Sequence, residues 1–178
     1  MIRFKARLLA PAADGKGGWT FLVLPRAASA KLSTRGQTAV EGTLNGVAFK
    51  AMLDPDGQKS HWLKVSRKLR EAAGAAVGDD VELDIAPADQ APEPTVPADL
   101  RKALAAAPKA RAVWSQITAA ARHDWILWIT SAKRAETRTS RIESACDMLG
   151  SGKRRVCCFD RSGVYGKNLS APAAKALP

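Results

Sequence analysis

A proline-rich segment at residues 87–97 separates two kinds of hydrophobic pattern, and it constrains this chain more than any other feature. Four of its eleven residues are proline. Proline fixes φ and lacks an amide donor, so the segment excludes helix and central strand and predicts a stiff, extended linker. Apolar residues recur every second position before it and every three to four positions after it, which predicts an α+β protein.

Residues 1–86 are predicted to form a small β-barrel domain of six strands, with short helices at 25–32 and 66–73. The N-terminal segment 2–8 alternates apolar and cationic residues, as a half-buried strand does. Asn45-Gly46 supplies the two positive φ angles of a type I′ turn, which predicts a hairpin there.

The charges on two of these strands predict which strands are neighbours. One strand has a cationic outer row and the other an anionic one: Arg3, Lys5 and Arg7 against Asp80, Glu82 and Asp84. Opposite charges across strands contribute about 0.2–1 kcal/mol per pair, whereas each row alone repels itself. We therefore expect the first and last strands to pair and to close the sheet into a barrel. Two separately solvated edges are the alternative.

After the linker, residues 98–150 are predicted to form a helical domain. Leu100 and Leu104 begin its apolar stripe, and Asp124 is a candidate cap for its third helix. A tryptophan cluster in this domain is expected to be core: Trp114, Trp125 and Trp128. Residues 151–178 carry a net charge of +5 and are expected to form a basic, flexible tail.

The inventory of reactive side chains favours a protein that is not an enzyme. His61 and His123 fall in different domains, and Cys157-Cys158 are adjacent, so no ligand set of zinc spacing is present and no metal or other cofactor is expected. His61 at a strand start is interpreted as a structural hydrogen-bonding residue. If the protein were a small enzyme, His61 and Asn45 would be its candidate pocket residues, in a site between the barrel and the helices.

An arginine stripe on the last predicted helix is the best candidate for a binding site. Arg134, Arg138 and Arg141 share one face, and none has an acidic residue three or four positions away. They also lie near the helix start, where the dipole disfavours cations. Either a carboxylate from elsewhere in the fold or a bound anion must compensate them. In the second case the basic run Lys153, Arg154 and Arg155 would assist.

Several segments together resemble a known pair of bacterial domains. The first domain resembles a small β-barrel domain of unknown function through Val40-Glu41-Gly42-Thr43-Leu44-Asn45-Gly46, His61-Trp62-Leu63-Lys64-Val65, Leu69-Arg70-Glu71-Ala72-Ala73-Gly74 and Gly78-Asp79-Asp80-Val81. The second resembles the YdeI/OmpD-associated helical domain through Val96-Pro97-Ala98-Asp99-Leu100, Trp128-Ile129, Ala132-Lys133-Arg134, Glu136-Thr137-Arg138 and Arg141-Ile142. The resemblance implies a barrel joined to a helical unit and an association with bacteriocin protection and tolerance of cationic antimicrobial peptides. It brings no catalytic residues.

The charge and hydropathy set the expected function. The longest apolar run has five residues, at 125–129, so a cytoplasmic protein without a transmembrane segment is expected. The net charge of +11 disfavours direct capture of cationic peptides. We therefore expect a non-enzymatic binding and stress-tolerance protein that acts through an anionic partner, either protein or nucleic acid. Weak, sequence-nonspecific nucleic-acid binding and a small interdomain enzyme are the alternatives, and the oligomeric state is left open.

Overall fold

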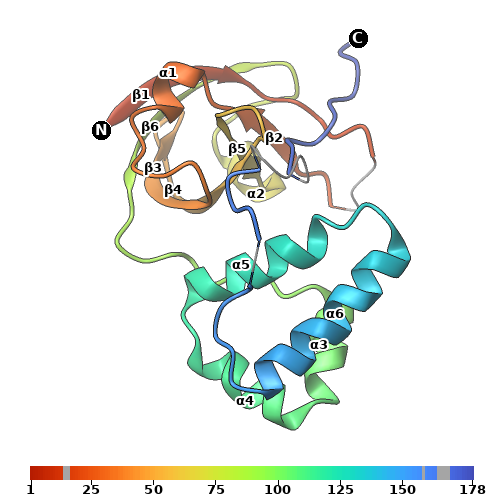
Figure 1. Ribbon diagram of the computed structural model, residues 1–178. Helices are drawn as coiled ribbons and strands as arrows, with labels where there is room; N and C mark the ends of the chain where they lie inside the picture. The colour runs from red at the N-terminus through yellow and green to blue at the C-terminus, as the bar shows by residue number, and fades with distance from the viewer. Residues whose placement is uncertain (14–16, 158, 164–168) are drawn as a thin grey trace. The chain divides into compact units, whose positions relative to one another are not determined.

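The computed structural model describes residues 1–13, 17–157, 159–163 and 169–178. The chain divides into two compact units, which Figure 1 shows as a β-sheet unit and a helical unit. The first, the β unit, contains residues 1–91 and 160–178, and the second, the helical unit, contains residues 92–159. The α+β class predicted from the change in periodicity is confirmed.

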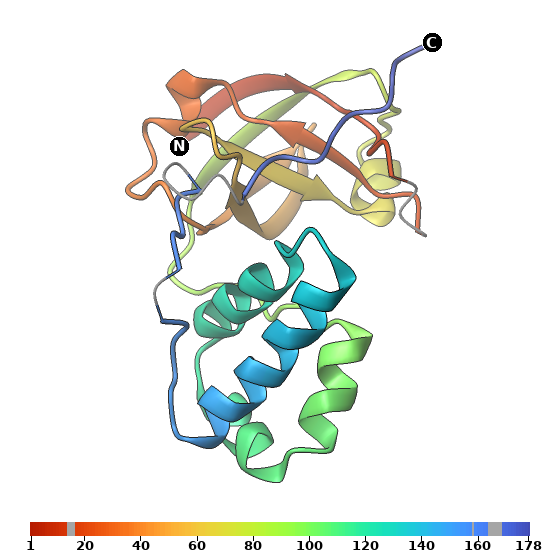
Figure 2. The same ribbon diagram turned by 45° about the vertical axis from the view of Figure 1, so that its right-hand side comes forward.

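The described residues of the β unit form one six-stranded antiparallel sheet with the order β1-β6-β3-β4-β5-β2. Its strands are β1 (Ile2–Arg7), β2 (Thr20–Val23), β3 (Thr38–Leu44), β4 (Val47–Pro55), β5 (His61–Val65) and β6 (Asp80–Pro87). Two short helices accompany them, α1 (Arg26–Ser29) and α2 (Arg67–Ala72). The sheet curls around its inner face as a half-barrel, which Figure 2 shows from the side.

The opposite charges of β1 and β6 do face each other, as predicted. The register places Arg3 opposite Asp84, and these side chains form an ion pair of 3.1 Å. However, this pair does not close the sheet, because β1 and β2 are its two edges. The edges approach at a bridge between Leu9 and Phe21, whose two backbone hydrogen bonds measure 2.8 and 2.9 Å. The predicted pairing of β1 with β6 and the curled six-stranded sheet are thus confirmed, but the edges approach after β1 and at β2, not between β1 and β6.

Gly42 on β3 allows the tight curl. A Cβ atom at this position would lie 2.0 Å from the carbonyl oxygen of Asp84 on β6, far inside van der Waals contact. Glycine in a strand interior often marks such a close backbone approach. The hairpin that follows β3 has the predicted turn, with φ of 46° at Asn45 and 83° at Gly46.

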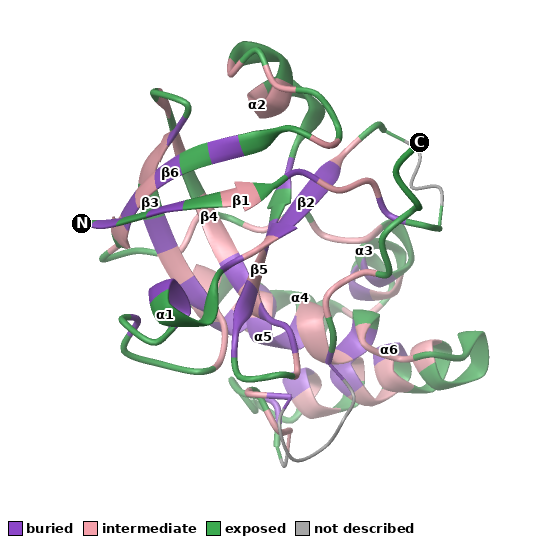
Figure 3. Ribbon diagram, turned by 90° about the horizontal axis from the view of Figure 1, so that it is seen from above, coloured by how far each residue is buried: buried purple, intermediate pink, exposed green. Residues whose placement is uncertain are grey.

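The inward side chains of the strands form the core of the β unit. Alternate residues are buried along β6, where the pattern gives Val81, Leu83 and Ile85 to the interior. Figure 3 shows the same alternation of purple and green along β6. The period-2 pattern of the sequence thus predicts which face of β6 is buried.

Part of the C-terminal segment packs on the β unit. Ala174 forms an antiparallel bridge with Pro11, and Leu169 is buried. A Cβ atom at Gly57 would lie 2.1 Å from the carbonyl oxygen of Leu169, so the two backbones touch there. Residues 158 and 164–168 of the predicted tail lie outside the described residues.

The described residues of the helical unit contain four helices: α3 (Ala98–Ala105), α4 (Pro108–Gln116), α5 (Ala119–Thr130) and α6 (Ala135–Gly150). Pro108 occupies the first turn of α4, where its missing amide is harmless. The hydroxyl of Thr118 caps α5 by accepting a hydrogen bond from the amide of Ala121. The expectation that Asp124 caps this helix is wrong: Asp124 is a buried residue within α5.

The core of the helical unit includes the tryptophans, as predicted. Trp125 is fully buried and Trp114 is 9% exposed. Trp128 packs against the same cluster, with its ring edge-on to Trp125 at a centroid distance of 6.1 Å. These indoles therefore provide apolar area to the interior rather than a free stacking surface.

Candidate functional site

Arg138 of the arginine stripe forms a two-pronged ion pair with Asp99. Nε of Arg138 lies 2.6 Å from Oδ2 of Asp99, and Nη2 of Arg138 lies 3.0 Å from Oδ1 of Asp99. Asp99 is in the first turn of α3, so this pair fastens α6 to the beginning of α3. The hydrogen bond from Arg138 lowers the pKa of Asp99, although partial burial opposes the shift.

Arg141, one turn further along α6, is held by the end of α5. Its guanidinium donates to the carbonyl oxygen of Trp128 and, at 3.0 Å, to the hydroxyl of Ser131. It also lies over the indole of Trp128, 5.4 Å from the ring centroid. The last carbonyls of a helix lack intrahelical donors, so a cation here satisfies one of them and complements the helix dipole.

Arg134 differs from the other two stripe residues. It is the exposed residue immediately before α6, and it makes no side-chain hydrogen bond or ion pair with any residue that the structure describes. The stripe predicted from helical periodicity therefore divides by environment. Arg138 has a carboxylate partner, Arg141 has neutral partners, and Arg134 extends into solvent.

The basic run after α6 divides in the same way. Arg155 donates to Oδ2 of the buried Asp124 at 2.6 Å, which anchors this segment to α5. Among the described residues, the guanidinium of Arg154 contacts the amide oxygen of Gln116, at 3.4 Å, and no carboxylate. Lys153 is exposed, and its ammonium group pairs with no residue in the described part of the chain.

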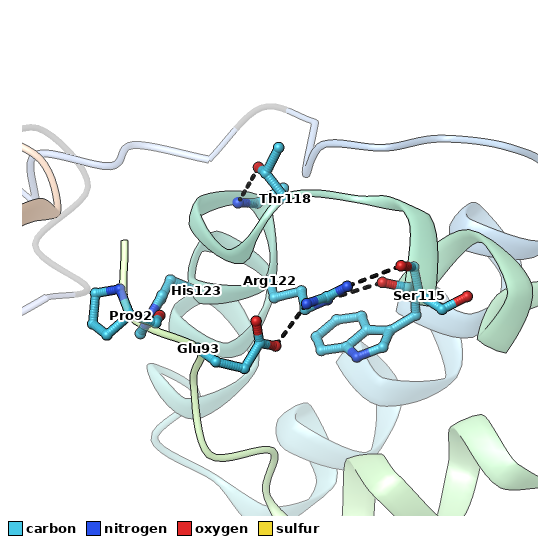
Figure 4. Close-up of polar contacts among 8 residues, drawn as sticks. Pro92, Glu93, Ser115, Thr118, Arg122 and His123 are labelled. Carbon is cyan, nitrogen blue, oxygen red and sulfur yellow. Dashed lines mark hydrogen bonds and ion pairs between the residues drawn. The ribbon is translucent and has the colours of Figure 1, made fainter. Parts of the chain in front are cut away.

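Arg122 and His123 of α5 contact the chain where it enters the helical unit (Figure 4). Arg122 was not predicted from the sequence as a functional or structural residue. The guanidinium of Arg122 contacts the carboxylate of Glu93 at 2.6 Å and two carbonyl oxygens at the end of α4 at 2.9 and 3.0 Å. His123 donates through Nε2 to the carbonyl of Pro92 at 2.7 Å. Arg122 and His123 thus fix residues 92–93, which the sequence assigns to the linker.

His61 is fully buried in the β unit, and both ring nitrogens are hydrogen-bonded. Nε2 donates to the carbonyl of Gly36 at 2.9 Å, which leaves Nδ1 to accept from the hydroxyl of Ser29 at 2.7 Å. Burial lowers the pKa of His61, because its charged form would lose solvation. Its polar atoms are thus used by the fold, as the structural interpretation predicts.

Asn45 also serves the fold. It adopts a positive φ in the hairpin turn, its side-chain oxygen accepts from the amide of Glu82 at 2.9 Å, and its amide nitrogen lies 3.5 Å from the carbonyl of Ala73. These bonds join the β3–β4 turn to the start of β6 and to the end of α2. The geometry places both candidate pocket residues, Asn45 and His61, in structural networks of the β unit.

A groove of about 390 Å³ lies in the β unit where β4 and β5 diverge. These two strands pair only between 53–55 and 61–63, so among the described residues the first part of β4 has β3 on one side and no strand on the other. Three exposed lysines line this groove, Lys50, Lys64 and Lys68, and none of its lining residues is acidic. The sequence analysis missed this cluster because its members come from three elements with no shared periodicity.

Within the described residues, no group of three potential metal ligands is close enough to hold an ion. Burial raises the pKa of the Cys146 thiol, which keeps it protonated. Cys157 is exposed, and Cys158 lies outside the described residues. No helix in the described part is long and apolar enough to cross a membrane.

The fold and these basic residues define a class of protein with a small curled-sheet domain followed by a cationic helical domain. Comparison with family models identifies both. Residues 4–85 match the domain of unknown function DUF1905, and residues 93–152 match OmdA, described as "Bacteriocin-protection, YdeI or OmpD-Associated". The chain therefore combines an N-terminal DUF1905 domain with an OmdA domain. No curated protein matches it.

Proposed function

We propose that this protein is a non-enzymatic binding protein in bacteriocin tolerance, and that its helical unit engages an anionic partner. One observation carries the proposal: four of the six predicted anion-binding residues have no carboxylate partner among the described residues. These are Arg134, Arg141, Lys153 and Arg154. The unit contains twelve Lys and Arg against six Asp and Glu, so its own carboxylates leave much of the charge uncompensated.

The sign of this charge selects the partner. A surface with excess cations attracts anions and accelerates their encounter, and it repels cationic peptides. Direct sequestration of a cationic bacteriocin is therefore disfavoured, and an anionic protein through which tolerance is conferred fits better. The match of residues 93–152 to the OmdA domain supports the link to bacteriocin protection.

A nucleic acid is a weaker candidate for the anionic partner. Proteins that hold single strands without sequence preference combine cations with exposed aromatic platforms. In the helical unit Trp125 is buried, and Arg141 lies over the ring of Trp128. Charge alone would give only salt-sensitive, sequence-blind binding to a duplex.

The test compares two triple variants with equal charge loss. Arg134→Gln, Lys153→Gln and Arg154→Gln remove cations from the helical unit, whereas Arg26→Gln, Lys31→Gln and Lys59→Gln remove exposed cations from the β unit. The readouts are survival of expressing cells under bacteriocin challenge and affinity capture from native cells, with and without nuclease.

The first variant should lose survival and the captured partner, and the second should keep both. Equal behaviour of the two variants would refute a site on the helical unit. Capture that disappears after nuclease treatment would identify the nucleic-acid alternative.

A further inference from the structure

The groove beside β4 contains a free strand edge. Over residues 47–52, β4 pairs with β3 on one side, and its other side faces the groove. In an antiparallel ladder with a two-residue type I′ turn, Leu44 and Val47 form a hydrogen-bonded pair, and alternate residues then point away from β3. The amides and carbonyls of Ala48 and Lys50 therefore face the open side, whereas Met52 already lies next to the residues that pair with β5.

No described residue satisfies these backbone groups. Among the described residues, β5 pairs with β4 only over 53–55, and no other hydrogen bond reaches the groove-facing backbone groups of Ala48 and Lys50. Native proteins usually cover, shorten or charge such edges, because an unpaired edge is a template for a further strand. Here Lys50 provides a charge on the edge itself.

The groove has two chemically different surfaces. Its floor is apolar, with Phe49, Ala51 and Leu69 packed against the core of the β unit. Its rim carries Lys50, Lys64 and Lys68. The ammonium nitrogen of Lys50 lies 3.4 Å from Oε2 of Glu41, and the ammonium nitrogen of Lys64 lies 4.7 Å from the ring centroid of Trp19.

We propose that this groove binds an extended peptide segment of a partner protein, in which acidic residues alternate with small apolar residues. The segment adds a strand to the free edge of β4. Because side chains alternate across a strand, one set contacts the apolar floor while the other set reaches the lysine rim. This site lies on the β unit and is distinct from the anionic-partner surface proposed for the helical unit.

The test uses a fluorescein-labelled, end-blocked peptide of alternating glutamate and valine, Glu-Val-Glu-Val-Glu-Val, with fluorescence anisotropy of the full chain. Lys50→Gln, Lys64→Gln and Lys68→Gln together should weaken binding about tenfold, since exposed ion pairs are individually weak but act together here. Lys102→Gln, Lys109→Gln and Lys133→Gln remove the same charge from exposed positions of the helical unit and should leave binding unchanged. Equal weakening by both triples would overturn the proposal.

A second measurement tests the added strand and needs no protein variant. One peptide carries N-methyl groups on its glutamates, and another carries them on its valines. Only one of the two sets of amides can face β4, so one peptide should lose binding and the other should retain it. Equal binding by both would exclude strand addition. Binding of oleate with no binding of the unmodified peptide would also overturn the proposal, in favour of an anionic amphiphile.

Discussion

Arg138 and Asp99, 39 positions apart in sequence, are joined by two hydrogen bonds between α6 and the first turn of α3. The Arg138 side chain is 33% exposed and that of Asp99 is 45% exposed, so solvent screens the pair. We expect Arg138→Gln to lower the free energy of unfolding by about 1 kcal/mol, the upper part of the range for exposed pairs, because the geometry is bidentate.

A double-mutant cycle with Asp99→Asn, measured by urea unfolding at low and high salt, checks this prediction. The coupling free energy should fall as salt rises. Arg134→Gln is the matched control and should leave stability unchanged, since Arg134 has no described partner. The prediction fails if both arginine variants unfold at the same urea concentration.

His61 should make the stability of the β unit depend on pH. Burial lowers the pKa of His61, while an unfolded histidine titrates at about 6.5. Below that pH the unfolded state therefore binds more protons than the folded state, so the free energy of unfolding should decrease as pH falls from about 6.5 towards the folded pKa.

Denaturant unfolding between pH 8 and pH 5, for wild type and His61→Gln, measures this slope. The variant should be less stable at pH 8 but should show a smaller loss on acidification. Ser29→Ala, which leaves Nδ1 without its donor, should cost about 1–3 kcal/mol. A wild-type slope that His61→Gln does not reduce would show that another group causes it.

Gly42 should tolerate no side chain. Because a Cβ atom there would lie 2.0 Å from the carbonyl oxygen of Asp84, Gly42→Ala must push β3 away from β6 or prevent folding. A loss of several kcal/mol, or no soluble protein, is expected. Gly150→Ala is the control. The nearest atoms to its added Cβ are 3.9 Å away, and alanine favours helix, so its thermal midpoint should not decrease.

The paired charge rows of β1 and β6 can be tested by exchange. Arg3→Asp alone, or Asp84→Arg alone, places like charges opposite each other and should destabilise the β unit by about 0.2–1 kcal/mol beyond the loss of the pair. The double exchange should recover most of that loss. Thermal unfolding of the four proteins gives the result, and an additive double variant would show that the ion pair contributes nothing.

Local chemistry made much of this fold predictable. Asn45-Gly46 admits few backbone conformations other than its turn, and the charge rows of β1 and β6 make their pairing favourable. The short helix predicted at 66–73 is present as α2, and the hydroxyl of Ser66 caps its start by accepting a hydrogen bond from the amide of Leu69. Each of these features was predictable because the residue types and their spacing along the chain are typical of one local structure.

What could not be predicted depends on contacts between distant segments. No sequence pattern relates Asp99 to Arg138, which lies 39 positions away. The arginine stripe alone therefore could not show whether a carboxylate of the same protein or a bound anion compensates the charge of Arg138. Likewise, an aspartate before an apolar run is typical of a helix cap, and this pattern predicted that role for Asp124. Its ion pair with Arg155 could not be predicted, because Arg155 lies 31 positions away. The lysine groove follows from the divergence of β4 and β5, which strand periodicity does not encode.

The bridge between Pro11 and Ala174 has a consequence for biosynthesis. During translation the helical unit leaves the ribosome before Ala174 and Leu169, the residues that complete the β unit. The nascent sheet therefore has part of its surface exposed to solvent until residues 160–178 have been synthesised, after the helices of the second unit. Premature release within residues 160–178 would yield chains that contain all six strands of the described sheet and the helices α3 to α6 but lack the segment that covers part of the β unit.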